Sequence, residues 1–306
     1  MFSFNKKIMS YIGLFFVVFI WGISPLITLR LYEYYSPCIR TFFLEVILFI
    51  TYLVISAKHI NELSVEYIKP GLLTGFFFSL ANITQKIGLM YTTPARYAFL
   101  ESLSCITVPI VMFLLVKKKP HPLAIFSCML CIIGIFIIND VSGSSGSLGF
   151  GEILCAISGL LYGCNIAGTS VFAKNLYAPL YLAVQCFVGI IVSLIFALTL
   201  NFIKVPSASG IPVAMEKIQF SLRPELIIFM IVYAIIGSAL CWIIRTNSMK
   251  HIDPTTVAII MPFSAVVTAI LSVLIGDDTF SLNLLFGGTI VVVSMITSSF
   301  ADIKQT

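Results

Sequence analysis

The stretch YIGLFFVVFIWGISPLITLRL, residues Tyr11–Leu31, contains a single charged residue, Arg30. A helix needs about 20 mainly apolar residues to cross the hydrocarbon core of a bilayer, so this stretch is long enough to span a membrane. Lys6 and Lys7 precede it, as basic residues precede the apolar region of a signal peptide. No small-residue cleavage site interrupts the apolar run, and we therefore expect a retained first membrane span.

The rest of the chain repeats this apolar pattern. The protein has 306 residues, of which 59% are hydrophobic and 10% charged, with a mean hydropathy of +1.07. Soluble domains carry about 25% charged residues, so the composition excludes a water-soluble enzyme, a nucleic-acid-binding protein and a disordered chain. Ten spans are predicted, at Tyr11–Leu31, Pro37–Ala57, Pro70–Tyr91, Ala95–Val116, Pro122–Asn139, Phe150–Phe172, Pro179–Ile203, Pro224–Met249, Pro254–Ile275 and Ser281–Phe300.

The basic residues predict the orientation of these spans. With the N-terminus inside, the inner loops hold ten lysines, whereas the outer loops hold four clear basic residues, three of them in the long loop before the eighth span. Arg30 and Arg40 lie near the outer boundary. Because positive charge favours the cytoplasmic side, we expect a multi-pass protein of the cell membrane with both termini in the cytoplasm.

The chain also divides into two similar halves. Trp21-Gly22 lies in the middle of the first span and Tyr162-Gly163 in the middle of the sixth. The expected units are a five-helix repeat at residues 1–141, a Gly/Ser-rich linker at 142–149 and a second five-helix repeat at 150–306. Because five spans are an odd number, the second half must insert upside down relative to the first. An all-α integral membrane fold of ten helices in two inverted repeats follows, with a substrate path expected at the repeat interface.

Two ionisable residues flank the short hairpin at Thr93 and Pro94. Lys86 lies about seven residues before the hairpin and Glu101 about seven after it, so both are expected roughly 10 Å below one membrane surface. A buried charge costs at least about 2.5–3.5 kcal/mol in the bilayer centre and needs a partner, water or a function. The pair is either a functional switch, in which Lys86 attracts an anion and Glu101 exchanges a proton, or a static ion pair.

Polar neighbours surround both residues. Asn82 is four residues before Lys86 and shares its helix face, with Gln85 offset from that face, and Tyr97 is four residues before Glu101. In hydrocarbon these side chains must face the interior of the bundle. They either line a polar cavity or form hydrogen bonds between helices without a role in transport.

Two further charges lie within predicted spans. Arg245 is expected either to bind an anionic substrate, to pair with Glu45, or to extend its long side chain to the cytoplasmic interface. Glu45 lies near the middle of the second span, where it is a second candidate for carrying a proton or else a structural partner for a basic group. Glu152 starts the sixth span and is expected at the membrane interface.

Three aromatic residues lie inside spans rather than at the interfaces where Trp and Tyr usually gather. Trp21, Tyr162 and Trp242 are expected either to line and close a central cavity or simply to pack. Pro109 and Pro262 lie within corresponding helices of the two halves. A proline removes a helical hydrogen bond, and breaks at matching positions either indicate a binding site or are fixed kinks without ligand contact.

Motifs for catalysis, metal binding and ATP use are not found in the sequence. There is no Gly-x-Ser-x-Gly elbow, no phosphate-binding loop and no spacing of His and Cys that suits a metal. The eight cysteines lie in or beside apolar runs and are expected to be buried thiols. We expect no enzymatic activity, no cofactor and no metal.

Several short motifs resemble the drug/metabolite transporter superfamily in its EamA-like branch. Residues 85–95, QKIGLMYTTPA, resemble the third and fourth helices of that family, and Pro254-Thr255-Thr256 with Met261-Pro262 resemble its ninth helix. The Trp21-Gly22 pair and Arg40 match its first two helices. The resemblance implies ten helices in inverted repeats, both termini inside, and export or exchange of small metabolites, often amino acids.

These features together predict secondary transport by alternating access. The substrate is expected to be a small zwitterionic or anionic metabolite, amino acids first, with export favoured over import and a proton exchanged through Glu101 or Glu45. The expected partners are membrane lipid, the small-molecule substrate and, as one assembly that the sequence allows, a second copy of the chain, but no nucleic acid. The alternatives are a non-transporting scaffold, a lipid-handling subunit and, least favoured, an intramembrane enzyme.

Overall fold

The structure, a computed structural model, describes all residues except 1, 118, 139–148, 203–218, 277–280 and 305–306. The described residues are helical or lie in short connections. The helices are α1 (Phe2–Leu31), α2 (Pro37–Ile55), η1 (Ala57–Glu62), α3 (Val65–Leu89), α4 (Pro94–Glu101), α5 (Ser104–Val116), α6 (Pro122–Ile138), α7 (Phe150–Phe172), α8 (Ala178–Phe202), α9 (Pro224–Val232), η3 (Tyr233–Leu240), α10 (Cys241–Ser248), α11 (Pro254–Ile260), α12 (Phe263–Ile275) and α13 (Leu282–Lys304). The predicted linker at 142–149 lies outside the described residues except for Gly149.

Seven helical stretches of the described chain are long and apolar enough to cross a membrane. They are residues 6–31, 37–55, 96–116, 150–172, 178–200, 224–248 and 254–275. Helices α6 and α13 contain shorter apolar stretches. The polar residues Asn82, Gln85 and Lys86 lower the hydropathy of α3, although this helix has 25 residues and lies within the bundle. The chain is thus an all-helical, multi-pass membrane protein.

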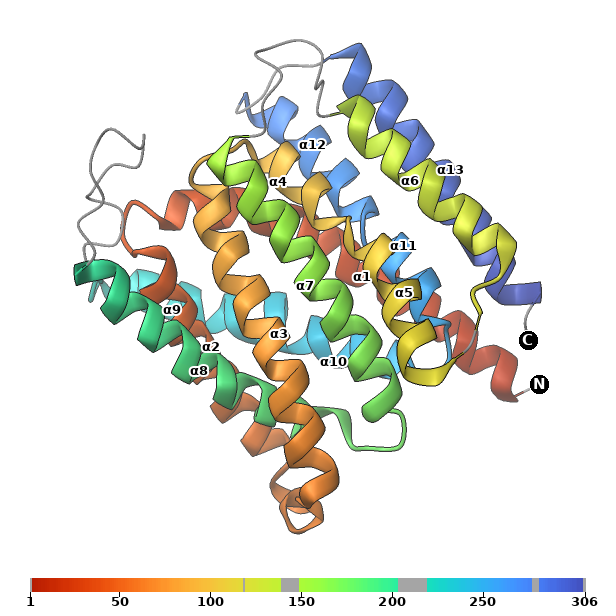
Figure 1. The fold of residues 1–306 in the computed structure, drawn as a ribbon. Helices are drawn as coiled ribbons and strands as arrows, with labels where there is room; N and C mark the ends of the chain where they lie inside the picture. The colour runs from red at the N-terminus through yellow and green to blue at the C-terminus, as the bar shows by residue number, and fades with distance from the viewer. Residues whose placement is uncertain (1, 118, 139–148, 203–218, 277–280, 305–306) are drawn as a thin grey trace.

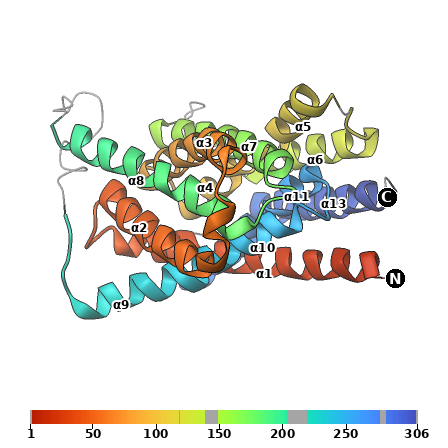
Figure 2. The ribbon, with the colours of Figure 1, turned by 90° about the horizontal axis from the view of Figure 1, so that it is seen from below.

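The helices form one bundle in which segments distant in sequence lie side by side. Helix α3 packs between α7 and α8, α2 packs along α8, and α1 contacts both α10 and α12. Helices α6 and α13 lie together along one edge (Figure 1). Helix α1 begins and α13 ends at the same end of the bundle, as the turned view confirms (Figure 2).

Two predicted spans are each divided into two helices. The fourth span consists of α4 and α5, which are separated after Glu101, and the ninth consists of α11 and α12, which are separated at Met261 and Pro262. Counted from Pro94 and Pro254, which start the two spans, the interruptions fall at nearly the same position. Pro109 lies inside α5 and does not cause the first interruption, contrary to our expectation of matching proline breaks.

Pro109 has a different structural consequence. Because proline has no N–H group, the carbonyl four residues earlier, that of Cys105, loses its helical partner. The thiol of Cys128, on the neighbouring helix α6, lies 3.1 Å from this carbonyl oxygen and donates to it. The freed carbonyl therefore has a partner within the bundle, as buried polar groups in a membrane require.

Two glycines allow close packing of helices on either side of the bundle centre. A Cβ atom at Gly22 of α1 would lie 2.6 Å from Cβ of Val267 on α12. A Cβ atom at Gly163 of α7 would collide in the same way with Cβ of Thr107 on α5. These are the glycines of the Trp-Gly and Tyr-Gly pairs that the sequence singled out. Their backbones pack directly against the partner helices and thereby fix the preceding aromatic residues.

The eighth span changes its helical geometry in its middle. Residues Tyr233–Leu240 form a π-helix, in which each N–H bonds the carbonyl five residues earlier. An α-helix turns about 100° per residue, so Trp242, nine residues after Tyr233, would point to the opposite side of a continuous α-helix. A π-helix has about 4.4 residues per turn and turns about 82° per residue. The two helix types differ by about 18° per residue, or about 140° over the eight residues of the segment. Trp242 therefore points to within roughly 40° of the direction of Tyr233 around the helix axis.

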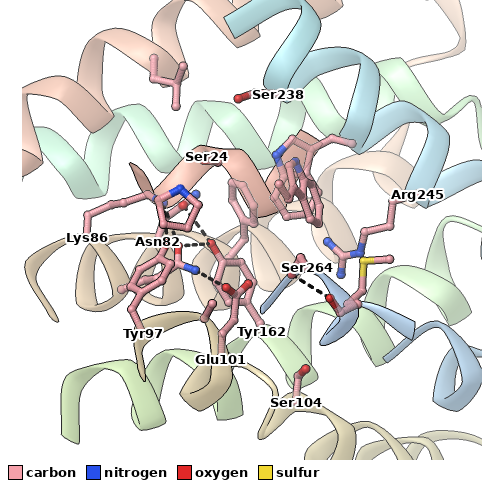
Figure 3. A pocket seen from close by; sticks show the side chains of 18 of the residues that line it. Ser24, Asn82, Lys86, Tyr97, Glu101, Ser104, Tyr162, Ser238, Arg245 and Ser264 are labelled. Atoms are coloured by element: carbon pink, nitrogen blue, oxygen red, sulfur yellow. Dashed lines mark hydrogen bonds between the residues drawn. The ribbon is translucent and has the colours of Figure 1, made fainter. Parts of the chain in front are cut away.

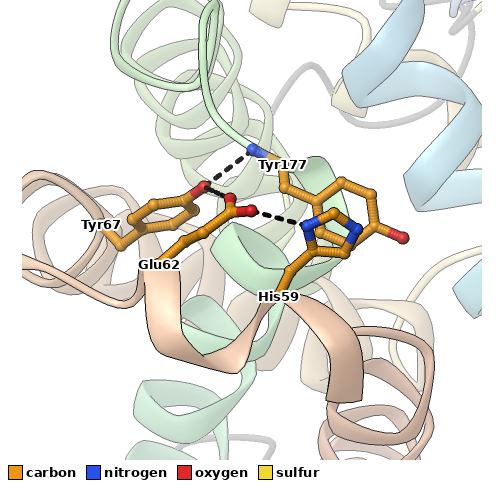
Figure 4. A network of polar contacts seen from close by, with 4 residues as sticks. All are labelled: His59, Glu62, Tyr67 and Tyr177. Atoms are coloured by element: carbon orange, nitrogen blue, oxygen red, sulfur yellow. Dashed lines mark hydrogen bonds and ion pairs between the residues drawn. The ribbon is translucent and has the colours of Figure 1, made fainter.

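A polar cluster connects two loops at one end of the bundle (Figure 4). The ring of His59 lies 2.7 Å from a carboxylate oxygen of Glu62 and stacks on the ring of Tyr177 at 4.1 Å. The hydroxyl of Tyr67 donates to Glu62 at 3.3 Å and accepts a hydrogen bond from the backbone N–H of Tyr177 at 3.0 Å. The hydrogen bond with His59 holds the pKa of Glu62 below its usual value. The cluster joins the α2–α3 connection to the chain between α7 and α8.

Candidate functional site: a charged cavity in the centre of the bundle

A cavity lies where α1, α2, α3, α4, α7, η3 and α10 converge, closed on a further side by the interruption between α11 and α12. About 90 Å³ is open to the centres of water molecules, and a bound water needs roughly 10–15 Å³ of such space. The cavity therefore has room for several waters or a small ligand. Its described lining includes three cations, Arg40, Lys86 and Arg245, and two carboxylates, Glu45 and Glu101.

Lys86 and Glu101 are joined through an amide rather than by a direct ion pair. The ammonium of Lys86 donates to Oε1 of Gln85 at 3.0 Å, and the Nε2 group of Gln85 donates to Glu101 at 2.6 Å (Figure 3). Lys86 also donates to the hydroxyl of Tyr97 at 3.0 Å. The direct ion pair between Lys86 and Glu101 that the sequence allowed is thus not observed. The amide satisfies both charges while keeping them apart.

The same network continues toward the second carboxylate. The hydroxyl of Tyr162 lies 2.9 Å from Oδ1 of Asn82 and 3.2 Å from Oε1 of Gln85. The amide nitrogen of Asn82 donates to Glu45 at 3.2 Å. Glu45 and Glu101, the two proton-carrying candidates, are therefore linked through three neutral polar side chains. A continuous path of hydrogen-bonding groups thus joins the two carboxylates.

Aromatic rings form the opposite wall. Trp21 and Trp242 have ring centroids 4.7 Å apart, and Phe78 meets Trp242 edge to face at 4.8 Å. The indole N–H of Trp21 donates to the carbonyl oxygen of Gly237 in the π-helix at 3.2 Å. This bond ties α1 to the segment that rotates Trp242 into the cavity.

In both arginines of the cavity, buried guanidinium nitrogens have no hydrogen-bond partner among the described residues, as is also true of Oε2 of Glu45. Arg40 is 1% exposed, its guanidinium lies 5.3 Å from the ring centroid of Tyr233, and its Nε has no partner. Arg245 is 2% exposed and lies 4.6 Å from the ring centroid of Trp242, and its Nε and one terminal nitrogen have no partner. The expected pairing of Arg245 with Glu45 is not observed; Arg245 lies in the cavity, on the side opposite Lys86 (Figure 3).

The structure brings all of the sequence-predicted site residues to this one cavity. They are Trp21, Glu45, Asn82, Gln85, Lys86, Tyr97, Glu101, Tyr162, Trp242 and Arg245. Gln85 was expected off the face shared by Asn82 and Lys86, yet all three side chains line the cavity. Residues three and four apart lie on one side of a helix, and Gln85 is three residues from Asn82. Glu152 lies elsewhere, near the α3–α4 turn, where it accepts a hydrogen bond from Thr92 at 2.8 Å.

Among the lining residues that sequence reasoning missed, Arg40 and Tyr233 contribute most to the charged part of the cavity. Arg40 matched a motif on the second helix but was placed near the outer boundary, although its side chain is among the largest fully buried ones. Tyr233 gave no signal, because its orientation depends on the π-helix; its hydroxyl lies 2.5 Å from the hydroxyl of Ser24. Arg40 lies three residues after Pro37, the first residue of the second predicted span. Treating every arginine inside a predicted span as a site candidate would have identified it. Among the described residues no group of three His, Cys, Asp or Glu side chains could hold a metal.

Comparison with known proteins agrees with this architecture. A protein of Archaeoglobus fulgidus described as an uncharacterized transporter is 22% identical over 298 residues, which cover 96% of this chain and 87% of that protein. A solved crystal structure of a protein superposes with a TM-score of 0.68 at 12% identity and covers 98% of both chains, which shows a shared fold. The model of the EamA-like transporter family matches twice, at residues 8–140 and 149–300. The chain belongs to the EamA-like transporter family.

Proposed function

We propose that this protein is a secondary active transporter that moves a small polar metabolite through the central cavity by alternating access. The observation that carries the proposal is the hydrogen-bonded network of Lys86, Gln85 and Glu101 beside a water-sized space in the middle of the bundle. Ionisable side chains inside a membrane are costly and mark substrate or ion pathways. A scaffold needs no space beside its buried charges.

The proposed architecture is ten spans in two inverted five-helix repeats, residues 1–141 and 150–306. Three observations support it: the family model matches each half separately, the spans starting at Pro94 and Pro254 are interrupted at nearly the same distance from their first residue, and the two halves pack alike. Gly22 of α1 abuts Ser264 and Val267 of α12, and Gly163 of α7 abuts Ser104 and Thr107 of α5.

In this scheme the two repeats rock against each other around the cavity. In both interrupted spans the α-helical hydrogen bonding breaks at the cavity wall. The breaks lie next to Glu101 at the end of α4 and at Met261 between α11 and α12. Irregular backbone within a membrane is tolerated where it lines a cavity. The interruptions supply places where the outer and inner halves of a span reorient separately.

We assign proton exchange to Glu101 or Glu45. Both carboxylates line the cavity, and each accepts a hydrogen bond from a neutral amide, Gln85 for Glu101 and Asn82 for Glu45. Protonation of either carboxylate removes a negative charge from the cavity and changes the balance against its three cations. That change couples the protonation state to the affinity for a charged substrate.

We propose amino acids as the first substrate class to test, export as the direction, and a cell-membrane location with both termini in the cytoplasm. The common position of the start of α1 and the end of α13 supports the last point (Figure 2). The substrate class and the direction rest on the family, whose matched relative is described as a transporter.

The test is flux in proteoliposomes that contain the purified chain and an imposed pH gradient. Vesicles are loaded with radiolabelled amino acids, and Glu101→Gln is compared with Glu66→Gln, which changes an exposed carboxylate at the start of α3. We expect gradient-dependent efflux from the unmodified protein and from Glu66→Gln, and a loss of at least about tenfold in Glu101→Gln. A folded protein that gives no flux with any metabolite pool would refute transport and favour the scaffold.

A further inference from the structure

The two guanidinium groups of the cavity both contain buried nitrogen atoms without a hydrogen-bond partner in the described part of the chain. Nε of Arg40 and both Nε and a terminal nitrogen of Arg245 are buried, yet no described residue accepts a hydrogen bond from them. Both side chains are at least 98% buried, and both line the cavity. A buried donor without a partner destabilises the fold, and more so when it is charged. A fold that keeps two such groups in one cavity leaves them for an acceptor that enters it.

The remaining charges do not supply that acceptor. Glu101 is bound by Gln85, Glu45 by Asn82 at Oε1, and Lys86 by Gln85 and Tyr97. Oε2 of Glu45 is buried without a partner among the described residues, and no hydrogen bond joins it to either guanidinium group. With every group ionised, the described lining carries three positive and two negative charges, a net charge of +1. Protonation of either carboxylate increases this excess. The ligand that completes the cavity is therefore an anion.

The two arginines, one on α2 and one on α10, contact aromatic rings at two separate positions along the eighth span. Arg40 lies over the ring of Tyr233 and Arg245 over the ring of Trp242. These two rings are nine residues apart, and the π-helix between them turns both toward the cavity. At a rise of about 1.2–1.5 Å per residue, their Cα atoms are separated by roughly 11–13 Å. Guanidinium groups that lie over rings this far apart along the helix favour two separate anionic groups over one compact carboxylate or phosphate.

We propose that the cavity selects an elongated small molecule with two anionic groups, one bound by Arg40 and the other by Arg245. Each planar guanidinium matches a carboxylate with two parallel hydrogen bonds, and the aromatic ring behind it fixes its plane. Lys86, which lines the same cavity, adds a third positive charge. This inference specifies the substrate of the transporter proposed above and rests on that function.

The chain offers a direct optical readout for this binding. Its two tryptophans, Trp21 and Trp242, both line the cavity, and the Arg245 guanidinium lies 5.9 and 4.6 Å from their ring centroids. A ligand that engages Arg245 therefore changes the intrinsic tryptophan fluorescence. The full chain in detergent is titrated with succinate, glutarate, adipate and pimelate, with monocarboxylates of equal chain length as matched probes.

We expect one dicarboxylate of the series to bind at least about tenfold more tightly than its monocarboxylate counterpart. Arg40→Gln and Arg245→Gln should each abolish this preference, whereas Arg223→Gln, which changes an exposed arginine outside the cavity, should preserve it. If a glutamine variant does not fold, Arg40→Lys or Arg245→Lys replaces it. Lysine keeps the charge but lacks the planar fork, and it should also reduce the preference.

Equal binding of mono- and dicarboxylates, or a preference unchanged in both arginine variants, would overturn the inference. The binding assay requires no flux, so its outcome is separable from that of the proposed function. Dicarboxylate binding without flux contradicts transport alone, whereas gradient-driven flux of neutral amino acids that is insensitive to both variants contradicts only the two-anion substrate.

Discussion

The π-helix of the eighth span makes a quantitative prediction about the deletion of one residue. Removing Ile236, which is 50% exposed on the outer face of the segment, should convert Tyr233–Leu240 into α-helix. Trp242 then lies eight residues after Tyr233, about 80° away on the helix, and Arg245 lies about 20° away. Both remain on the cavity side, within roughly 50° of their present directions. We therefore expect the deletion variant to keep its cavity.

The matched control is the deletion of Ile191, which is 44% exposed in the uninterrupted helix α8. There one missing residue rotates the rest of the helix by about 100° and shortens it by about 1.5 Å. The side chains that follow the deletion must leave their present contacts with α2 and α3. We expect this variant to misfold or to lose far more stability than the Ile236 deletion.

Tryptophan fluorescence and thermal unfolding in detergent measure the two outcomes. In the Ile236 variant the emission maximum should stay close to that of the unmodified chain, because Trp21 and Trp242, whose ring centroids lie 4.7 Å apart in the unmodified chain, both remain inside the bundle. Equal loss of stability in both variants, or a solvent-exposed tryptophan in the Ile236 variant, would show that the π-helix does not set the phase of this span.

Three further predictions follow from named contacts. Gly163→Val should destabilise the chain by about 1–3 kcal/mol, measured by thermal unfolding in detergent, since the added side chain collides with α5. Lys86→Met and Glu101→Gln should each lower stability more than the double variant does, because the double variant removes one charge of each sign and leaves the net charge of the cavity unchanged. Additive losses would argue against coupling. The hydrogen bond with His59 lowers the pKa of Glu62 in the folded state. The stability that this ionised carboxylate contributes is therefore complete above the pKa of Glu62 in the unfolded chain, about 4.5, and is lost as the pH falls through the lower pKa of the folded state. Glu62→Gln should remove this pH dependence, which thermal unfolding midpoints measured between about pH 3 and about pH 6 would show.

Much of the site was predictable because burial in a membrane is restrictive. A charged or amide side chain inside an apolar run must face the interior of the bundle or a cavity rather than lipid. Lys86, Glu101, Asn82 and Gln85 all line the cavity. Periodicity along one helix is a local property and can be read from spacing. The partner across the cavity is not, and the link between Lys86 and Glu101 through the amide of Gln85 followed only from the packing of α3 against α4.

The sequence by itself determined that the chain spans a membrane many times, where its apolar runs lie, and which polar residues must avoid lipid, because each of these follows from the cost of exposing polar groups to hydrocarbon. The tertiary structure decided the rest. The π-helix between Tyr233 and Leu240 is a change in hydrogen-bond register that hydropathy does not reveal, and it contributes to turning Trp242 and Arg245 toward the cavity that Arg40 enters from α2. Which charges face one another depends on contacts between helices distant in sequence, and these contacts form only when the bundle packs.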